Sequence, residues 1–315
     1  MSRATLAAAL GVVALALMMS FTAPRAATRA FDQQPPSSGD LVELDVVALD
    51  RDGRPVTDLQ ASDFQIKDDG QRVDLKTFEA VTADGLTSDG ARSMVLLLDD
   101  SGVPMGGTVV VQAIAASILS RMRRGDEVTV VRLNNERDEA FGDTDTARQR
   151  IAEYHGGAVP FQVPGTLDRA LRVLASVSRS LEAVEHRRKI VVCVGSPAVC
   201  NMIEPQPRGY SLLWRPWVAA ISAASRANVS VYAAMPIAPG GVLILGGGLA
   251  DMTGGTGFRN TVKFDSFVDA MWLEASRYYL LGYWPPAKSS ARELHSVEVK
   301  VNRKNVRVRS RRQRG

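Results

Sequence analysis

The sequence has 315 residues, of which 45% are hydrophobic and 23% are charged. This composition is ordinary for a globular protein, and the length is sufficient for a large core and two structural units. The formal net charge of +4 is mild, and the basic excess is concentrated at the C-terminus, so charge alone indicates no partner for the body of the chain.

The N-terminal stretch 1–27 has the pattern of a secretory signal peptide. Arg3 provides a positive start, an apolar run follows at 6–19, and small residues come after it. Pro24 interrupts the cleavage pattern, so an uncleaved anchor in the inner membrane is the alternative. Residues 28–40 are rich in Gln, Pro, Ser and Gly, which is typical of a flexible tether. We therefore expect an exported protein, periplasmic or extracellular.

Residues 41–81 predict an N-terminal β unit. The segment 42–49 alternates apolar and polar side chains, as in a half-buried strand. Strands at 64–67 and 72–78 flank Asp-Asp-Gly at 68–70, which is a strong hairpin signal. The spacing of the acidic residues does not match a calcium loop, so they are interpreted as turn formers.

The central feature is the apolar run 94–98, which is too short to span a membrane and too continuous for a surface strand. It predicts a strand buried on both faces of a parallel sheet. Asp99, Asp100, Ser101 and a glycine follow it, and a helix is expected at 108–124. In open α/β sheets, ligands bind at the carboxyl ends of the strands, which is where these oxygen atoms would lie.

Strands and helices alternate through the rest of 93–276. This order predicts an α/β fold with a doubly wound, mostly parallel sheet and helices on both faces. The further strands are expected at 127–133, 190–194 and 229–234, and the further helices at 144–154, 167–181, 210–227 and 264–276.

The chain ends in predicted strands within 277–311. One is expected at 278–283, and 295–301 and 306–309 are expected to form a hairpin. Neither flank of the α/β domain is large enough to bury a core of its own. We therefore expect these strands to pack with 41–81 as one small all-β module, with the α/β domain inserted between the two flanks.

Three stretches together resemble bacterial, Acidobacteria-type VWFA-related secreted proteins, which contain a von Willebrand factor A domain. They are VVALDRDGRPVTDLQASDFQIKDDGQRVDLKTFEAV, the core strand with its Asp-x-Ser loop, and YYLLGYWPP followed by basic strands. The resemblance covers roughly 41–312. It implies a von Willebrand factor A, Rossmann-like fold, an exported location and a binding role, and it implies little about a defined activity.

The resemblance also implies a metal-ion-dependent adhesion site, which this sequence matches only in part. Asp99 and Ser101 match the first loop, but Val103 replaces its last serine. Thr166 matches the threonine of the second loop. The family normally has an aspartate in the third loop, after a buried strand. This sequence lacks that aspartate and has Ser196 in the loop. Since Mg²⁺ requires near-octahedral oxygen ligands, we expect a degenerate site that holds Mg²⁺ or Mn²⁺ weakly or not at all.

The two cysteines, Cys193 and Cys200, leave two interpretations open. An oxidising compartment would allow a disulfide, and the alternative is a buried thiol and a loop thiol. The three histidines, His155, His186 and His295, lie in separate predicted segments with no nucleophile motif beside them. We therefore expect no enzymatic activity.

The tail 303–314 contains seven basic residues. Arg307, Arg309 and Arg311 alternate, so on a strand they would share one face. This face would attract an anionic envelope surface, or it would only be a solvated edge that prevents aggregation. Nucleic acid is not expected as a partner of an exported protein.

Two functional hypotheses follow. The first is an exported, non-enzymatic binding or adhesion module that engages an unknown protein ligand at the Asp99 edge, with weak or lost metal dependence. The second is a structural envelope-associated protein, tethered by its N-terminus, whose basic C-terminal strands contact the anionic surface.

Overall fold

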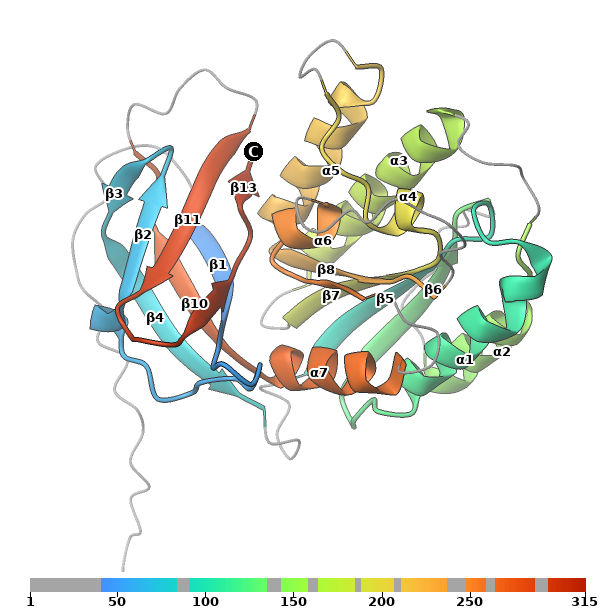
Figure 1. Cartoon of the computed structure of the whole chain (residues 1–315), viewed down its shortest axis with the longest axis horizontal. Helices are drawn as coiled ribbons and strands as arrows, with labels where there is room; N and C mark the ends of the chain where they lie inside the picture. Colours follow the sequence, from blue (N-terminus) through green and yellow to red (C-terminus); the bar gives the residue numbers. More distant parts are fainter. Residues whose placement is uncertain are drawn as a thin grey trace, which may run out of the picture.

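The computed structural model describes residues 41–83, 91–134, 143–157, 164–184, 188–206, 211–236, 248–258, 264–286 and 294–315. Two units lie side by side, a β sandwich and an α/β domain (Figure 1). The predicted signal segment and tether, 1–40, lie outside the described residues. Among the residues that are described, no helix has the length and apolar character needed to cross a membrane.

The α/β domain is built on a five-stranded sheet in the order β6-β5-β7-β8-β9, and all its strand pairs are parallel. Central strand β5 is buried along its whole length, because β6 and β7 flank it and helices cover both faces. The expectation of a parallel, doubly wound sheet is confirmed. The strands are β5 Arg92–Leu98, β6 Glu127–Arg132, β7 Arg188–Val194, β8 Val229–Ala234 and β9 Gly257–Phe258.

Each face of the sheet has its own apolar layer (Figure 1). One layer lies under α1, α2 and α7, and the other under α3 and α5 with the short α4 and α6. Alternate side chains of each strand enter opposite layers, because side chains in a strand point alternately to its two faces. The helices are α1 Thr108–Leu119, α2 Thr144–Ala152, α3 Pro164–Glu182, α4 Pro197–Cys200, α5 Trp214–Arg226, α6 Leu249–Met252 and α7 Phe264–Ser276.

The β sandwich consists of two four-stranded sheets, β12-β1-β10-β4 and β13-β11-β2-β3. Strands from both ends of the chain alternate in it, since β1 lies between β10 and β12. Their core includes the aromatic cluster of Phe64, Phe78 and Tyr279. The strands are β1 Val42–Leu49, β2 Phe64–Asp68, β3 Gln71–Val73, β4 Leu75–Thr82, β10 Arg277–Tyr283, β11 His295–Val301, β12 Arg307–Arg309 and β13 Gln313–Arg314.

Two strand predictions are wrong in this sandwich. The expected hairpin of 295–301 with 306–309 does not form, because β11 pairs with β2 and β13 while β12 pairs with β1 in the other sheet. The expected strand 72–78 is two strands, since β3 completes a hairpin with β2 and β4 joins the opposite sheet beside β10. In both places the chain crosses from one sheet to the other.

Buried charges join the two units. Arg188, at the start of β7, forms an ion pair with Asp45 of β1, and both side chains are almost wholly buried. The Arg188 guanidinium also lies over the ring of Tyr278, 4.6 Å from its centroid. Asp45 accepts a second hydrogen bond from the Asn228 side chain at 2.9 Å. The junction is therefore a fixed, polar contact.

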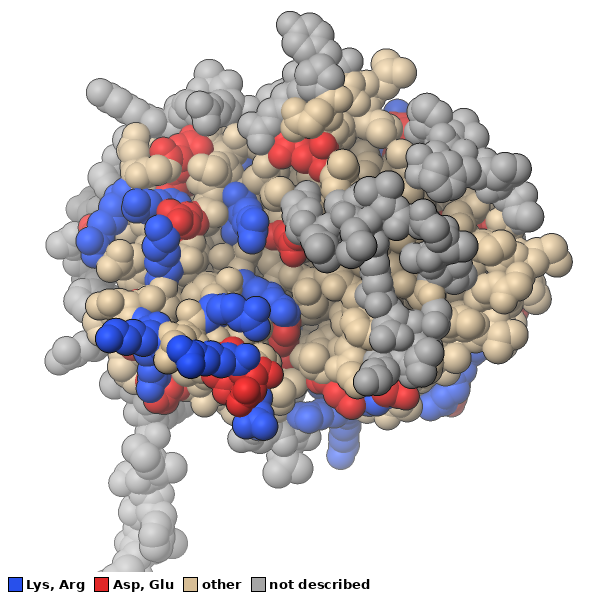
Figure 2. Space-filling model, viewed as in Figure 1, with Lys and Arg blue, Asp and Glu red and all other residues tan. Residues whose placement is uncertain are grey.

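The tail arginines also take part in this junction. Arg309 pairs with Glu274 of α7, and Arg311 is buried and donates to Asn228 Oδ1 at 3.2 Å. Burial lowers the pKa of Arg311 to about 10. The prediction that Arg307, Arg309 and Arg311 share a solvated face is therefore wrong for Arg311. The visible face of the sandwich carries intermixed positive and negative side chains (Figure 2).

Candidate functional site

Asp99 follows the last residue of β5 and is wholly buried at the carboxyl edge of the sheet. Its backbone N–H donates to the carbonyl of Val194 at 3.0 Å, which extends the pairing of β5 with β7 by one residue. Its carbonyl accepts a 2.7 Å hydrogen bond from the Tyr154 hydroxyl. Burial, with the charge of Asp99 adding to it, raises the pKa of Tyr154, so this phenol stays a hydrogen-bond donor. The backbone of Asp99 is thus held from two sides.

Five hydrogen bonds converge on the Asp99 carboxylate. Oδ1 accepts from the Ser101 N–H at 3.1 Å, the Ser101 hydroxyl at 3.3 Å and the Gly102 N–H at 2.6 Å. Oδ2 accepts from the Ser196 N–H at 3.0 Å and the Ser196 hydroxyl at 2.6 Å. A carboxylate has about four lone-pair positions, so these donors saturate it.

Two glycines allow the loops to approach this closely. A Cβ atom at Gly195 would lie 2.2 Å from the Asp99 Cβ, and one at Gly102 would lie 2.4 Å from the Ser196 Oγ. Neither distance is compatible with a side chain, because the neighbours are themselves held by the hydrogen bonds to Asp99. The loop after β5 and the loop after β7 are therefore packed directly against each other.

A disulfide fixes the second of these loops. Cys193 in β7 is bonded to Cys200 at the end of α4, with the two Cα atoms 5.2 Å apart. Of the two interpretations that the sequence left open, the structure therefore has the disulfide and not two free thiols. Ser196 lies inside the closed loop as the residue that precedes α4. The disulfide therefore restrains the segment that supplies two of the donors to Asp99.

The structure brings Asp99 and Ser101 together, and it adds Ser196, but it does not link Thr166 to them. Thr166 lies in the first turn of α3 and is partly exposed. Within the described ranges, Thr166 makes no hydrogen bond to Asp99 or Ser101. Val103 is wholly buried in the apolar layer under α1, so the position of the missing serine has become part of the core.

Asp100 belongs to a second, more exposed set of contacts at this edge. Its carboxylate accepts from the Asn134 N–H at 2.9 Å after β6, and the Asn134 side chain accepts from Arg169 of α3 at 2.8 Å. Burial raises the pKa of Asp100, since desolvation outweighs these favourable hydrogen bonds. Asp100 thus connects the loops that follow β5 and β6.

These residues fit a tightly bound Mg²⁺ ion poorly. The hydroxyls of Ser101 and Ser196 keep lone pairs that an ion would accept, but Asp99 would have to lose an existing hydrogen bond to become a direct ligand. Mg²⁺ in proteins is bound through one or two carboxylates and keeps several waters. A neutral pair of hydroxyls beside a saturated carboxylate is a weak ligand set.

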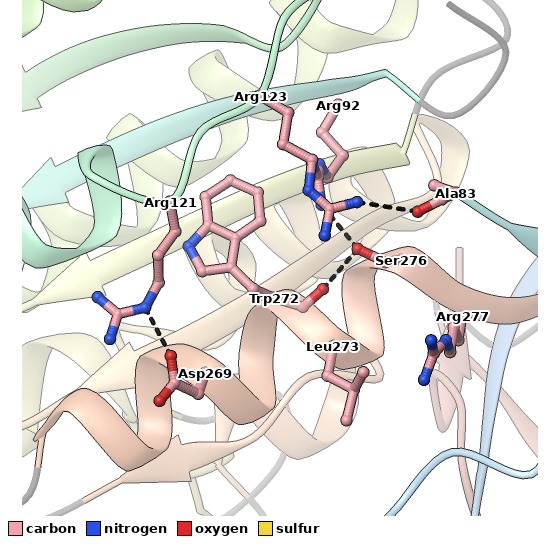
Figure 3. A pocket seen from close by; sticks show the side chains of 9 residues that line it. All are labelled: Ala83, Arg92, Arg121, Arg123, Asp269, Trp272, Leu273, Ser276 and Arg277. Atoms are coloured by element: carbon pink, nitrogen blue, oxygen red, sulfur yellow. Dashed lines mark hydrogen bonds and ion pairs between the residues drawn. The ribbon is translucent and has the colours of Figure 1, made fainter. Parts of the chain in front are cut away.

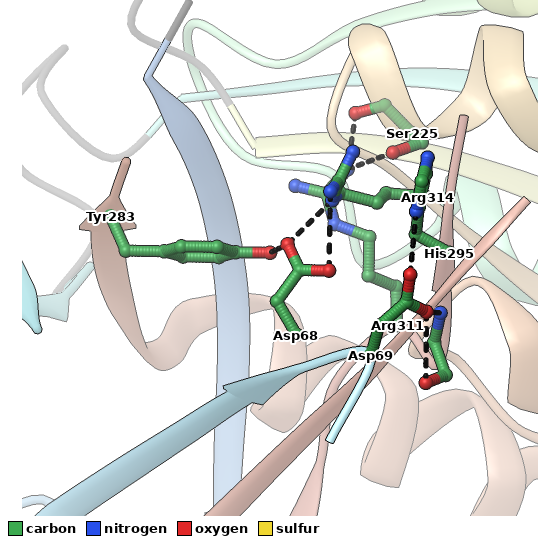
Figure 4. Close-up of polar contacts among 8 residues, drawn as sticks. Asp68, Asp69, Ser225, Tyr283, His295, Arg311 and Arg314 are labelled. Carbon is green, nitrogen blue, oxygen red and sulfur yellow. Dashed lines mark hydrogen bonds and ion pairs between the residues drawn. The ribbon is translucent and has the colours of Figure 1, made fainter. Parts of the chain in front are cut away.

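A second set of metal-ligating groups lies in the β sandwich, where one ligand atom each of Asp68, Asp69 and His295 falls within 4.8 Å of the others (Figure 4). Asp68 already accepts from the Arg314 Nε at 2.6 Å and the Tyr283 hydroxyl at 3.0 Å. Asp69 Oδ2 is 2.8 Å from the His295 Nδ1. The Arg314 guanidinium supplies the positive charge that a cation would bring, so we interpret this cluster as structural.

The carboxyl edge also exposes apolar side chains that sequence reasoning missed. Met105 and Val109 are each 72% exposed, and Leu212 is 89% exposed. Met105 and Val109 are four residues apart where η3 (Met105–Gly107) leads into α1, so they lie on one face. Leu212 precedes α5, and Ile203, which is also exposed, follows α4. The only signal in the sequence was the spacing of Met105 and Val109.

Comparisons with known proteins show no sequence relative. No protein-family model matches the chain, and no curated protein matches it. Among solved structures, manganese-loaded TRAP protein of Plasmodium vivax aligns with a TM-score of 0.39 at 10% identity, over 75% of this chain and 97% of that one. Human COPII-coat protein Sec24c aligns with a TM-score of 0.37 at 7% identity, over 70% of this chain and 43% of that one. Similarity at this level assigns no family.

Proposed function

We propose that this chain is an exported, non-enzymatic binding module of the von Willebrand factor A type. It engages a protein partner at the carboxyl edge of its parallel sheet, and it does so without needing a metal ion. The observation that carries the proposal is the location of the exposed Met105 and Val109 beside the Asp99 and Ser196 loops. The disulfide supports the exported location, because disulfides persist in oxidising compartments.

The strand order explains why this edge is favoured. Strand β5 is followed in the chain by β6 on one side, whereas β7 and β8 lie on its other side. The reversal between β5 and β7 is a topological switch point, where open α/β sheets bind their ligands. Asp99 follows β5 and Ser196 follows β7, so both loops emerge at this point.

The chemistry of the edge favours a protein surface over a small charged ligand. The carboxylate of Asp99 is buried and saturated, so it holds the loops in place and is not available to a ligand. The exposed groups are a methionine, a valine and a leucine, which gain by leaving water. Full burial of one such side chain contributes roughly 1.5–3 kcal/mol, so these residues would serve as the anchors of a larger contact.

A capture experiment tests the proposal. The purified protein is immobilised and exposed to the exported proteins of its own cell, with Mg²⁺ or with EDTA. Met105→Asp/Val109→Asp should abolish capture of a specific partner, and Gln71→Asp, which adds one charge to the exposed strand β3, should retain it. Capture that requires Mg²⁺, or that survives the double substitution, would contradict the proposal. Self-association of the wild-type protein that the double variant lacks would identify the partner as a second copy.

A further inference from the structure

A crevice of about 390 Å³ opens at the other edge of the parallel sheet, where the α/β domain meets the β sandwich (Figure 3). Four arginines line it, Arg92, Arg121, Arg123 and Arg277, together with the apolar Trp272 and Leu273 of α7. Asp269 is the one carboxylate among the described residues of the lining. We propose that this crevice binds the phosphate group of a small phosphate monoester. The proposal is independent of the carboxyl edge, which lies about 20 Å away along β5.

Two of the arginines are already paired with carboxylates. Arg92 is buried and forms a two-point pair with Asp126 at 3.0 and 2.8 Å. Arg121 pairs with Asp269 at 2.6 Å and with Asp265 at 3.2 Å. These two guanidinium groups build the walls of the crevice. The pair of Arg92 with Asp126 is neutral, whereas Arg121 with its two carboxylates carries one net negative charge.

The side chains of the other two arginines have no acidic partner among the residues that the structure describes. Arg123 is exposed and donates only to the backbone carbonyl of Ala83, at 3.0 Å, among the described residues. Arg277, at the start of β10, is exposed, and no ion pair of its side chain occurs in the described part of the chain. Within the described ranges, both guanidinium groups keep N–H donors without an acceptor, and arginine matches the geometry of phosphate oxygens.

Trp272 forms part of the crevice wall. Its side chain is only 7% exposed, and its Nε1–H has no hydrogen-bond acceptor within the described residues. Figure 3 shows the indole ring between Arg121 and Arg123, with its nitrogen on the Arg121 side. The nitrogen itself is buried, so the ring forms part of the wall and its N–H does not face a ligand. The Arg92 guanidinium lies 4.3 Å from the centroid of this ring and fixes its orientation.

The carbonyl ends of α1 and α7 face the same edge and would repel an anion. One carbonyl near each of these helix ends already accepts a side-chain hydrogen bond. Arg121 donates to the Ser117 carbonyl at 2.9 Å, and the Ser276 hydroxyl donates to the Trp272 carbonyl at 2.7 Å. Among the described residues, Arg123 and Arg277 contribute two positive charges and the Arg121 cluster contributes one net negative charge, so the crevice keeps a net positive charge for a ligand.

The donors and the volume together select the ligand class. A phosphate monoester carries between one and two negative charges at neutral pH on three acceptor oxygens, which two guanidinium groups match, whereas a carboxylate carries one charge. The volume lies at the lower end of the range for small-molecule sites, so it accommodates a phosphate group with a small organic part. Leu273 and the indole edge provide the apolar surface for that part.

Titration calorimetry at constant ionic strength tests the assignment with inorganic phosphate, glucose 6-phosphate, glucose and acetate. Saturable binding of the phosphate compounds is expected, with none for glucose or acetate. Tighter binding of glucose 6-phosphate than of phosphate would identify a monoester, and equal binding would identify the free ion as the source. Arg123→Gln and Arg277→Gln should each weaken phosphate binding about tenfold, and Arg124→Gln, an exposed neighbour outside the lining, should not.

Proton–nitrogen correlation spectra give a second readout that needs no substitution. The protein has four tryptophans, so the Trp272 indole signal can be resolved and assigned through its bonds to the backbone. Phosphate should shift this signal and leave the other three unchanged. Absence of binding, acetate binding as tightly as phosphate, or equal affinity in the Arg123→Gln and Arg277→Gln variants would overturn the proposal.

Discussion

The Ser196 hydroxyl donates a 2.6 Å hydrogen bond to Oδ2 of Asp99, although the two residues are 97 positions apart in the sequence. This contact joins the loops that follow β5 and β7, and it occupies the carboxylate that would otherwise be closest to a metal ion. The uncharged Ser196 can lie this close because it donates a proton. A carboxylate at the same position would instead repel Asp99.

This relationship predicts the outcome of placing an aspartate at the third loop. Ser196→Asp brings a second carboxylate against buried Asp99, so the free energy of unfolding should fall in EDTA, because two carboxylates sharing a site cannot both ionise freely. Mg²⁺ at ten times its Kd should restore about 1.4 kcal/mol. Urea denaturation with and without Mg²⁺ measures both effects.

Ser196→Asn is the matched control for this variant, because it has nearly the same shape and no charge. Its stability should not respond to Mg²⁺, and neither should that of the wild-type protein. A wild-type response as large as that of Ser196→Asp would show that the native site binds the ion, and it would refute the proposed loss of metal dependence.

The disulfide makes the second prediction. Cys193 and Cys200 are seven positions apart, and closing a loop of this length contributes about 2.5 kcal/mol in the chain-entropy description. Cys193→Ala/Cys200→Ser should lose about this much in urea denaturation under oxidising conditions. The backbone amide of Ser196 should also exchange its hydrogen faster, since the closed loop contains it. A reductant should destabilise the wild-type protein and leave the double variant unchanged; equal effects on both would contradict the assignment.

The buried pair between the two units makes the third prediction. Asp45→Asn leaves the Arg188 charge buried beside a neutral group, which costs about 3–5 kcal/mol when a buried pair is broken. Asp45→Asn/Arg188→Met should recover much of this loss, because no buried charge remains. The exposed pair of Arg303 with Asp58 is the control, and Asp58→Asn should change the stability far less, because solvent screens this pair. Chemical denaturation of wild type, Asp58→Asn, the double variant and the two single variants Asp45→Asn and Arg188→Met decides it, and additive losses at positions 45 and 188 would contradict the coupling.

The sequence predicted what local patterns determine. The apolar run before Asp99 identified the central strand, and the alternation of elements identified the parallel sheet. The positions of Asp99 and Ser101 followed from the rule for carboxyl edges. The strand pairing of the sandwich did not follow, because 295–301 and 306–309 have the same alternating pattern whether they pair with each other or with β2 and β1. Only the packing of distant segments separates these outcomes.

The tail arginines show the same limit more clearly. An arginine on an alternating strand usually faces solvent, yet Arg314 is buried against Asp68, which is 246 positions away. Arg311 is buried because Ser225 and Asn228 accept its hydrogen bonds. The crevice arginines are a further case. The sequence places Arg123 at the end of a predicted helix, and only the folded chain brings it to the same crevice as Arg277.

The last prediction concerns pH, and it rests on Asp100. Burial raises the pKa of this carboxyl above its ordinary value, so the folded protein binds a proton there more tightly than the unfolded chain does. Stability contributed by this group is therefore greatest at low pH, and it is lost as pH rises from the ordinary carboxyl range through the folded pKa. Asp100→Asn keeps an oxygen that can accept from the Asn134 N–H and removes the charge. The variant should be more stable than wild type at pH 7 and equal to it below pH 3, as measured by urea denaturation across pH.

Asp145→Asn, at an exposed position in α2, is the control and should show no such gain. A variant that is less stable at pH 7 would mean that the ionised carboxylate stabilises the loops after β5 and β6, and that hydrogen bonding there outweighs desolvation.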